Sequence, residues 1–196
     1  MEKDFWIWFK DNQELFLNLD NIDDDIRDSN LDKLLNELHR YSNSLFFLIG
    51  NHPNGQNEII ITAEGNPDMF CMVERLVSAA PVIENWVVLA FKQPANEHFV
   101  TKYNGLELDP NEIWFEPLQS AKNSSDLGLR LYLAEYDEIR HDDYINSLYC
   151  VLENALGELS LAKDIAYIDV FKLPVDFNRL VPFNELKEFI MWRNNR

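Results

Sequence analysis

The sequence predicts an α+β fold: a mixed, largely antiparallel sheet from two β-β-α-β pseudo-repeats, with helices packed on it. One observation is a pattern that occurs twice: a strand-like run, an amphipathic stretch and a second strand-like run. The runs are IIITAE, WVVLAFKQP, LRLYLAE and AYIDVFKLP at residues 59–64, 86–94, 129–135 and 166–174. A second is that each amphipathic stretch has one apolar face to bury. The alignment matches Ala63, Glu64 and Phe91 with Ala134, Glu135 and Phe171.

The chain of 196 residues, with 46% apolar side chains, is long enough to bury a sizeable core. This length predicts one domain, or two small halves that share a core. We divide the expected single domain, residues 1–196, into N-terminal helices at 1–43, a first β-β-α-β unit at 44–94, a second unit at 112–174, and a C-terminal tail and helix at 175–196.

Helical spacing of apolar residues predicts two helices before the first strand. Phe5, Phe9 and Phe16 belong to an aromatic stripe over residues 4–17. An acidic loop is expected at residues 20–28. Ser29, with an acidic residue three positions later, then predicts the start of a second helix.

The first unit begins with strands at 45–49 and 58–64, joined by a turn at 50–57. Asn66 and Pro67 are typical of a helix start. The apolar face of this helix is expected to contain Phe70, Val73, Val77 and Ala80. The continuous apolar run 86–91 predicts a central strand covered on both faces.

The second unit has expected strands at 113–115, 129–135 and 167–171, with a polar loop at 119–126. Asp142 or Asp143 is expected to cap its helix, and Gly157 to end it. The predicted inner face of this helix consists of Ile145, Leu148, Leu152, Ala155 and Leu156. A connector at 97–110 carries a short strand at 99–103. Asn184 is expected to cap a final helix that runs through Trp192.

The net charge of −17 disfavours binding to nucleic acid or to an anionic membrane, because both require clustered Lys and Arg. The same charge suits a basic protein partner. The first four residues lack a basic signal-peptide region, and no apolar stretch approaches the roughly 18 residues of a membrane span. Cys71 and Cys150 lack CxxC spacing, which predicts packed thiols in a reducing compartment. We therefore expect a cytoplasmic protein.

Metal and cofactor motifs are missing from the sequence. The acidic run contains Asp20, Asp23, Asp24, Asp25, Asp28 and Asp32. It has no central Gly of the kind that a calcium loop requires, so we interpret it as a solvated loop. The histidines lack the spacing of zinc ligands, and no phosphate-binding glycine motif occurs. We expect no metal and no cofactor.

The candidate site consists of Glu64, Glu135 and His141. The two glutamates follow matching strands of the pseudo-repeats, where paired carboxylates could act as acid and base or hold a metal. His141 precedes two aspartates that could orient its ring. The competing interpretation is that both glutamates are turn or capping residues.

Three segments carry a family resemblance: WFKDNQ at residues 8–13, ITAEG at 61–65, and Ala80-Pro81 followed by Trp86. They are similar to a family of uncharacterised bacterial proteins, and the similarity covers residues 5–94. This resemblance implies a bacterial, cytoplasmic protein with an α+β fold, and it implies no particular activity. The β–α–β units are also similar, at the level of fold, to inhibitors of the regulator-of-ribonuclease-E type.

Charge and the missing motifs together favour a non-enzymatic protein-binding or regulatory module with an acidic surface. The alternative is an enzyme or small-ligand binder that uses a groove between the two repeats, because pockets favour such junctions. Glu64, Glu135 and His141 would be its first candidate residues.

Overall fold

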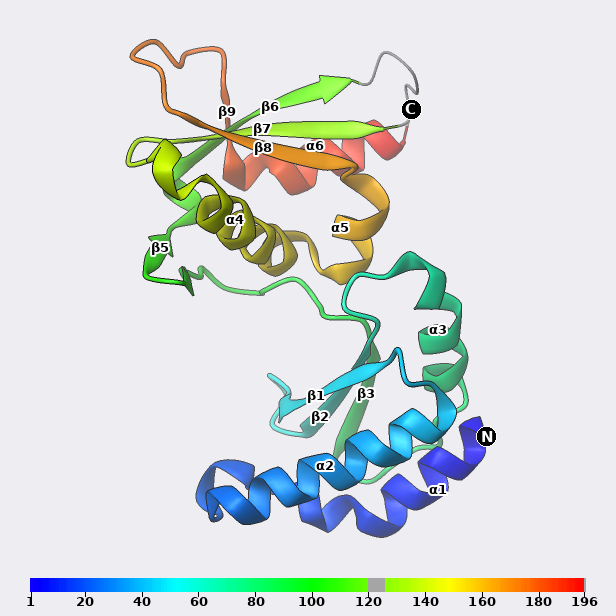
Figure 1. Ribbon diagram of the computed structural model, residues 1–196. Coiled ribbons are helices and arrows are strands. Elements are labelled where there is room, and N and C mark those ends of the chain that lie inside the picture. Colours follow the sequence, from blue (N-terminus) through cyan, green and yellow to red (C-terminus); the bar gives the residue numbers. More distant parts are fainter. Residues whose placement is uncertain (120–125, 196) are drawn as a thin grey trace. The chain divides into compact units, whose positions relative to one another are not determined.

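The computed structural model describes residues 1–119 and 126–195, and the predicted loop at 119–126 lies almost entirely outside them. The fold is α+β, as predicted. The chain divides into two compact units, Met1–Lys92 and Gln93–Arg196, which we call unit 1 and unit 2 and describe one at a time (Figure 1).

Unit 1 consists of α1 (Glu2–Asn12), α2 (Asp24–Tyr41), β1 (Phe46–Asn51), β2 (Asn57–Thr62), α3 (Phe70–Ser78) and β3 (Trp86–Ala90). Its sheet has the order β1-β2-β3, with β2 antiparallel to β1 and parallel to β3. The prediction of a central strand at 86–91 is therefore wrong. The continuous apolar run forms an edge strand whose residues 87–90 are only half-buried, and β2 is the strand with two partners.

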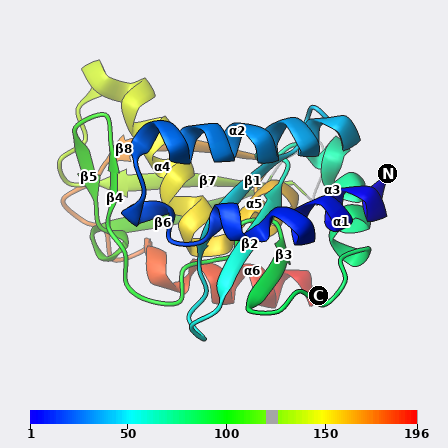
Figure 2. The ribbon, with the colours of Figure 1, turned by 90° about the horizontal axis from the view of Figure 1, so that it is seen from below.

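Aromatic side chains fix α1 to the rest of unit 1. Figure 2 shows α1 and α2 lying across one side of the sheet. Phe9 of α1 meets Trp86 of β3 edge to face, with ring centroids 5.0 Å apart. The buried Trp6 donates its indole N–H to the carbonyl of Leu76 in α3 at 2.7 Å. Because an unpaired buried N–H is costly, this bond specifies how α1 and α3 pack.

The start of α2 corrects the prediction for the acidic segment. Asp23 caps the helix by accepting the N–H of Asp25 at 3.0 Å, so the helix begins five residues before Ser29. Asp24 pairs with Arg27 one turn later at 2.9 Å. Carboxylates in the first turn favour the positive end of the helix dipole, which explains why so acidic a segment is helical.

In α3 the predicted cap is confirmed, since Asn66 accepts the N–H of Asp68 at the start of a short 3-10 turn. Phe70 and Val73 are buried as predicted, but Val77 is only half-buried, and Leu76 is fully buried in its place. Cys71 lies on the exposed side of the helix, so the expectation of a packed thiol is wrong there.

Unit 2 is built around a second sheet, with the order β8-β7-β6-β9, and a separate hairpin of β4 and β5. Its elements are β4 (Thr101–Tyr103), β5 (Leu106–Leu108), β6 (Ile113–Gln119), β7 (Leu127–Leu133), α4 (His141–Leu156), α5 (Glu158–Asp164), β8 (Tyr167–Lys172), β9 (Val181–Pro182) and α6 (Leu186–Asn194). As in unit 1, an antiparallel pair (β6 and β7) is followed by a helical crossover and a parallel strand.

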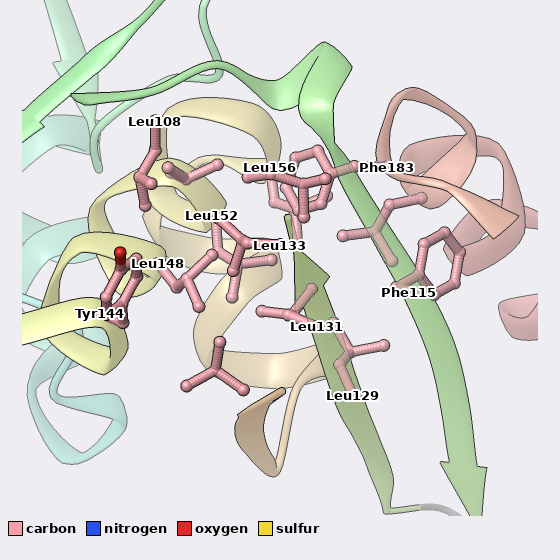
Figure 3. Close-up of a cluster of buried hydrophobic side chains, with 14 of the residues drawn as sticks. Leu108, Phe115, Leu129, Leu131, Leu133, Tyr144, Leu148, Leu152, Leu156 and Phe183 are labelled. Atoms are coloured by element: carbon pink, nitrogen blue, oxygen red, sulfur yellow. The ribbon is translucent and has the colours of Figure 1, made fainter. Parts of the chain in front are cut away.

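The core of unit 2 lies between the sheet and α4. Figure 3 shows Leu148 and Leu152 of α4 close to Leu133 of β7. Leu148, Leu152 and Leu156 are buried as predicted, whereas Ile145 and Ala155 are half-buried. Side chains from α6 belong to the same cluster, and Leu108 extends it to the hairpin.

Three details of unit 2 differ from prediction. Asp137, rather than Asp142 or Asp143, caps a 3-10 turn that leads into α4. Gly157 ends α4 as expected, with φ at 77°, but α5 follows it directly. Asn184 does not cap α6; it lies within a 3-10 turn before that helix, and its amide donates to Asn111 at 3.1 Å.

The two sheets share their order of connection but differ in register by one residue. Ile61 pairs with Ala90, whereas its aligned counterpart Tyr132 pairs with Phe171. The sequence match of Phe91 with Phe171 is thus displaced by one position, which turns the side chain to the other face. Phe91 is buried against the ring of Phe70, whereas Phe171 is 39% exposed.

Burial along α3 leads to a matched pair of substitutions. Val73→Ala removes two methyl groups from a fully buried site and should lower the free energy of unfolding by about 1–3 kcal/mol. Val77→Ala, on the same helix but half-buried, should cost clearly less. Denaturant unfolding of both variants measures the difference, and equal losses would contradict the packing of α3 described above.

Candidate functional site

Glu64 lies in unit 1, directly after β2, and its backbone has a left-handed φ of 51°. Its carboxylate pairs with Lys92 at 3.2 Å, and Lys92 follows the end of β3. The pair therefore joins the carboxyl ends of the two parallel strands. This contact supports a structural role for Glu64 in unit 1.

Glu135 and His141 lie in unit 2, on either side of the turn between β7 and α4. The carbonyl of Glu135 accepts the hydroxyl of Tyr144 at 2.6 Å. His141 Nδ1 is hydrogen-bonded to the hydroxyl of Tyr136 at 2.9 Å. Tyrosines therefore engage both residues, and within the described part of the chain no hydrogen bond joins Glu135 to His141. The three predicted residues are divided between the units.

A pocket of about 420 Å³ lies in unit 2 at the carboxyl ends of the parallel strands β7 and β8; we call it the strand-end pocket. Its volume is in the range of small-ligand sites, and ligands of open α/β sheets bind outside this end of the strands. Its apolar lining comes from Leu106, Leu108, Trp114, Leu133, Tyr144 and Leu173. Its carboxylates are those of Glu107, Asp109, Glu112 and Glu135.

One wall of the pocket is the β4–β5 hairpin, whose turn residues Asn104 and Gly105 both have positive φ. Two hydrogen bonds tie the hairpin to the start of α4, and a third, between Arg140 and Asp143, holds their partners together. Asn104 donates to Asp143 at 2.6 Å, and Arg140 donates to Asp143 at 3.0 Å and to the carbonyl of Asn104 at 2.7 Å. The hydrogen bond from Asn104, followed by that from Arg140, lowers the pKa of Asp143.

The floor of the pocket is buried and uncharged. Leu108, Leu133 and Tyr144 are each buried. Burial raises the pKa of Tyr144, so its phenol stays protonated while it donates to the carbonyl of Glu135. Trp114 is half-buried and lies against Phe177, with ring centroids 5.1 Å apart.

The four carboxylates of the pocket differ in their partners. Glu107 pairs with Lys102 across the hairpin at 3.1 Å. Asp109 accepts a backbone N–H at 2.8 Å and lies 3.5 Å from His98. The side chains of Glu112 and Glu135 make no hydrogen bond or ion pair to residues 1–119 or 126–195. These two carboxylates are the ones available to a ligand.

The carboxylates of Glu112 and Glu135 lie next to the ends of neighbouring strands, Glu112 just before β6 and Glu135 just after β7. Ile113 of β6 pairs with Leu133 of β7, so Glu112 and Glu135 flank the same end of this antiparallel pair. Carboxylates placed in this way around an apolar floor favour an organic cation. Among the described side chains, no group of three or more His, Cys, Asp or Glu residues could hold a metal ion.

Sequence reasoning found Glu135 but not the rest of the pocket. Residues 106–108 form a strand in which Glu107 is exposed between two leucines that line the pocket. That alternation is a strand signal. The hairpin turn Asn104-Gly105 was a second available signal. Neither pattern, however, indicates that the hairpin and the end of β7 surround one cavity.

Comparison of the chain with family models, curated proteins and solved structures finds no match. In the described residues, no helix is both long and apolar enough to cross a membrane. The assignment of function therefore rests on the geometry and charge of the chain.

The lowered pKa of Asp143 makes the attachment of the hairpin sensitive to acid. Because the folded pKa lies below the unfolded value of 3.8, the stabilisation is present above that value and is lost as pH falls through the folded pKa. Asp143→Asn should therefore lower the unfolding midpoint at pH 7, and the difference from wild type should shrink toward pH 3. Thermal unfolding between pH 3 and 7 measures it. Asp142→Asn, at an exposed neighbour, is the control; an equal effect there would argue against the hairpin bonds.

Proposed function

We propose that the protein is a non-enzymatic binding module for a basic protein partner, which it recognises through its acidic surface. The observation that carries the proposal is the strand-end pocket, whose lining combines an apolar floor with four carboxylates, two of which have no partner among the described residues. A cytoplasmic location and membership of a bacterial family are predictions from the sequence that accompany this proposal.

The charge of the chain supports this proposal because it is not confined to one segment. Unit 1 contains 16 acidic and 7 basic residues, and unit 2 contains 18 and 10, which gives formal charges of −9 and −8. A field of one sign over both units attracts a basic partner at long range and accelerates encounter. It equally repels nucleic acid and anionic membranes.

A small-ligand binder is the second candidate, and the volume of the strand-end pocket favours it. For this second candidate function, the ligand is held by the pocket in unit 2 and not by a groove between the repeats. Glu135 is then the predicted residue that contributes to the site. A thermal-shift screen with metabolites separates the two candidates, because a ligand raises the unfolding midpoint according to its concentration relative to Kd.

The proposed partner is to be isolated from host extract by affinity capture and then purified, and its association rate measured against salt. We expect a protein of high pI whose association rate falls at least tenfold between about 50 and 500 mM salt, because screening weakens electrostatic steering. A captured partner that is acidic, or a rate that does not change with salt, contradicts the proposal.

A charge-matched pair of double variants tests where the partner docks. Glu112→Gln with Glu135→Gln removes two charges at the pocket, and Asp32→Asn with Glu84→Gln removes two exposed charges from unit 1. Both should slow association slightly, since both reduce the net charge equally. Only the pocket variant should also accelerate dissociation, as measured by surface plasmon resonance. Equal dissociation rates would place the contact elsewhere.

A further inference from the structure

We infer that the strand-end pocket binds one Lys or Arg side chain of the partner, with the aliphatic stem on the apolar floor and the cationic head between Glu112 and Glu135. This inference rests on the proposed function, since it specifies how a basic partner would be held. It assigns the pocket a ligand class: a single ammonium or guanidinium group carried on a flexible hydrocarbon chain.

The first argument is the division of the pocket into an apolar and a charged part. Leu108, Leu133 and Tyr144 form a buried floor that has no charge of its own. Long basic side chains bury their methylene groups on such surfaces and keep the charged head at the edge. A divalent ion would gain nothing from this floor, whereas a Lys or Arg side chain uses both parts.

The second argument is the electrostatic balance of the lining. It includes four carboxylates, and none of the described lining residues is Lys, Arg or His. Lys102 and His98 approach Glu107 and Asp109 from outside the lining, which leaves Glu112 and Glu135 as the pair with no compensating partner among residues 1–119 and 126–195. A cation entering the pocket therefore displaces no internal partner from these two groups.

The third argument is Trp114, which lines the pocket and is only half-buried. An indole face attracts cations, and a guanidinium group both stacks on it and forms paired hydrogen bonds with carboxylates. An Arg side chain should therefore bind more tightly than Lys. The hydrogen bonds among Asn104, Arg140 and Asp143 hold the hairpin wall in place, so the cavity exists before the ligand enters.

The test uses N-acetyl-arginine methylamide as the probe, with the lysine analogue and the neutral citrulline analogue beside it. Titrations are followed by NMR on the backbone amides and the Trp114 indole N–H. We expect the arginine probe to shift signals of Trp114, Glu135 and Leu173, with a Kd on the order of 1 mM. The lysine probe should bind more weakly, and the citrulline probe should leave these signals unchanged.

Variants connect the binding to the two carboxylates. Glu112→Gln with Glu135→Gln should weaken the arginine probe about tenfold, since charge-assisted hydrogen bonds are lost. The control Asp32→Asn with Glu84→Gln should leave its affinity unchanged. Because all four side chains are exposed, we expect every variant to fold, and unfolding midpoints verify this.

Several outcomes would overturn the inference. They are equal binding of the citrulline probe, shifts confined to another surface, an unchanged affinity in the pocket variant, or tighter saturation of the same signals by spermidine or Mg²⁺. A basic partner that binds wild type and the pocket variant with the same dissociation rate overturns this inference and leaves the proposed function standing. Probe binding in the pocket, with every captured partner acidic, overturns the proposed function instead.

Discussion

The structure depends on one topological constraint, the crossover that joins two parallel strands. A parallel pair cannot be closed by a tight turn, so β2 continues through α3 to β3, and β7 through α4 and α5 to β8. Each crossover helix buries its apolar face on one side of its sheet. The carboxyl ends of both parallel strands consequently come together at one edge, and the predicted residues Glu64 and Glu135 follow those ends.

The two units complete that edge in different ways. In unit 1, Glu64 and Lys92 form an ion pair between the strand ends. In unit 2, Glu135 has no ion pair within the described residues, and the β4–β5 hairpin forms a wall beside it. Unit 1, which is described throughout, has no counterpart of this hairpin. The same framework thus produces a closed end in one case and a pocket in the other.

Periodicity in the sequence predicted most of the longer elements and most of the core, because burial of Val73 or Leu152 follows from local spacing on a helix; it did not predict α5, β5 or β9. It could not place β3 at an edge, since an apolar run does not record how many partners a strand has. The start of α2 was missed because Asp residues favour loops and helix starts alike. The pocket was missed because its carboxylates lie on separate segments, and the pairing of β6 with β7 brings Glu112 and Glu135 to the same end of these strands.

The one-residue displacement between the sheets limits how far the two units are interchangeable parts. Suppose that residues 166–174 replaced residues 86–94 and kept the register in which Phe171 pairs with Tyr132. Phe171 would then lie where Ala90 pairs with Ile61, and the strand would have to slide by one position to put Phe171 where Phe91 packs against Phe70. Without that slide, alternate side chains would face the wrong layer. The two units therefore share the order in which their strands are connected but not the placement of their side chains. A recombinant of the two would have to match the strand register and not only the similar residues.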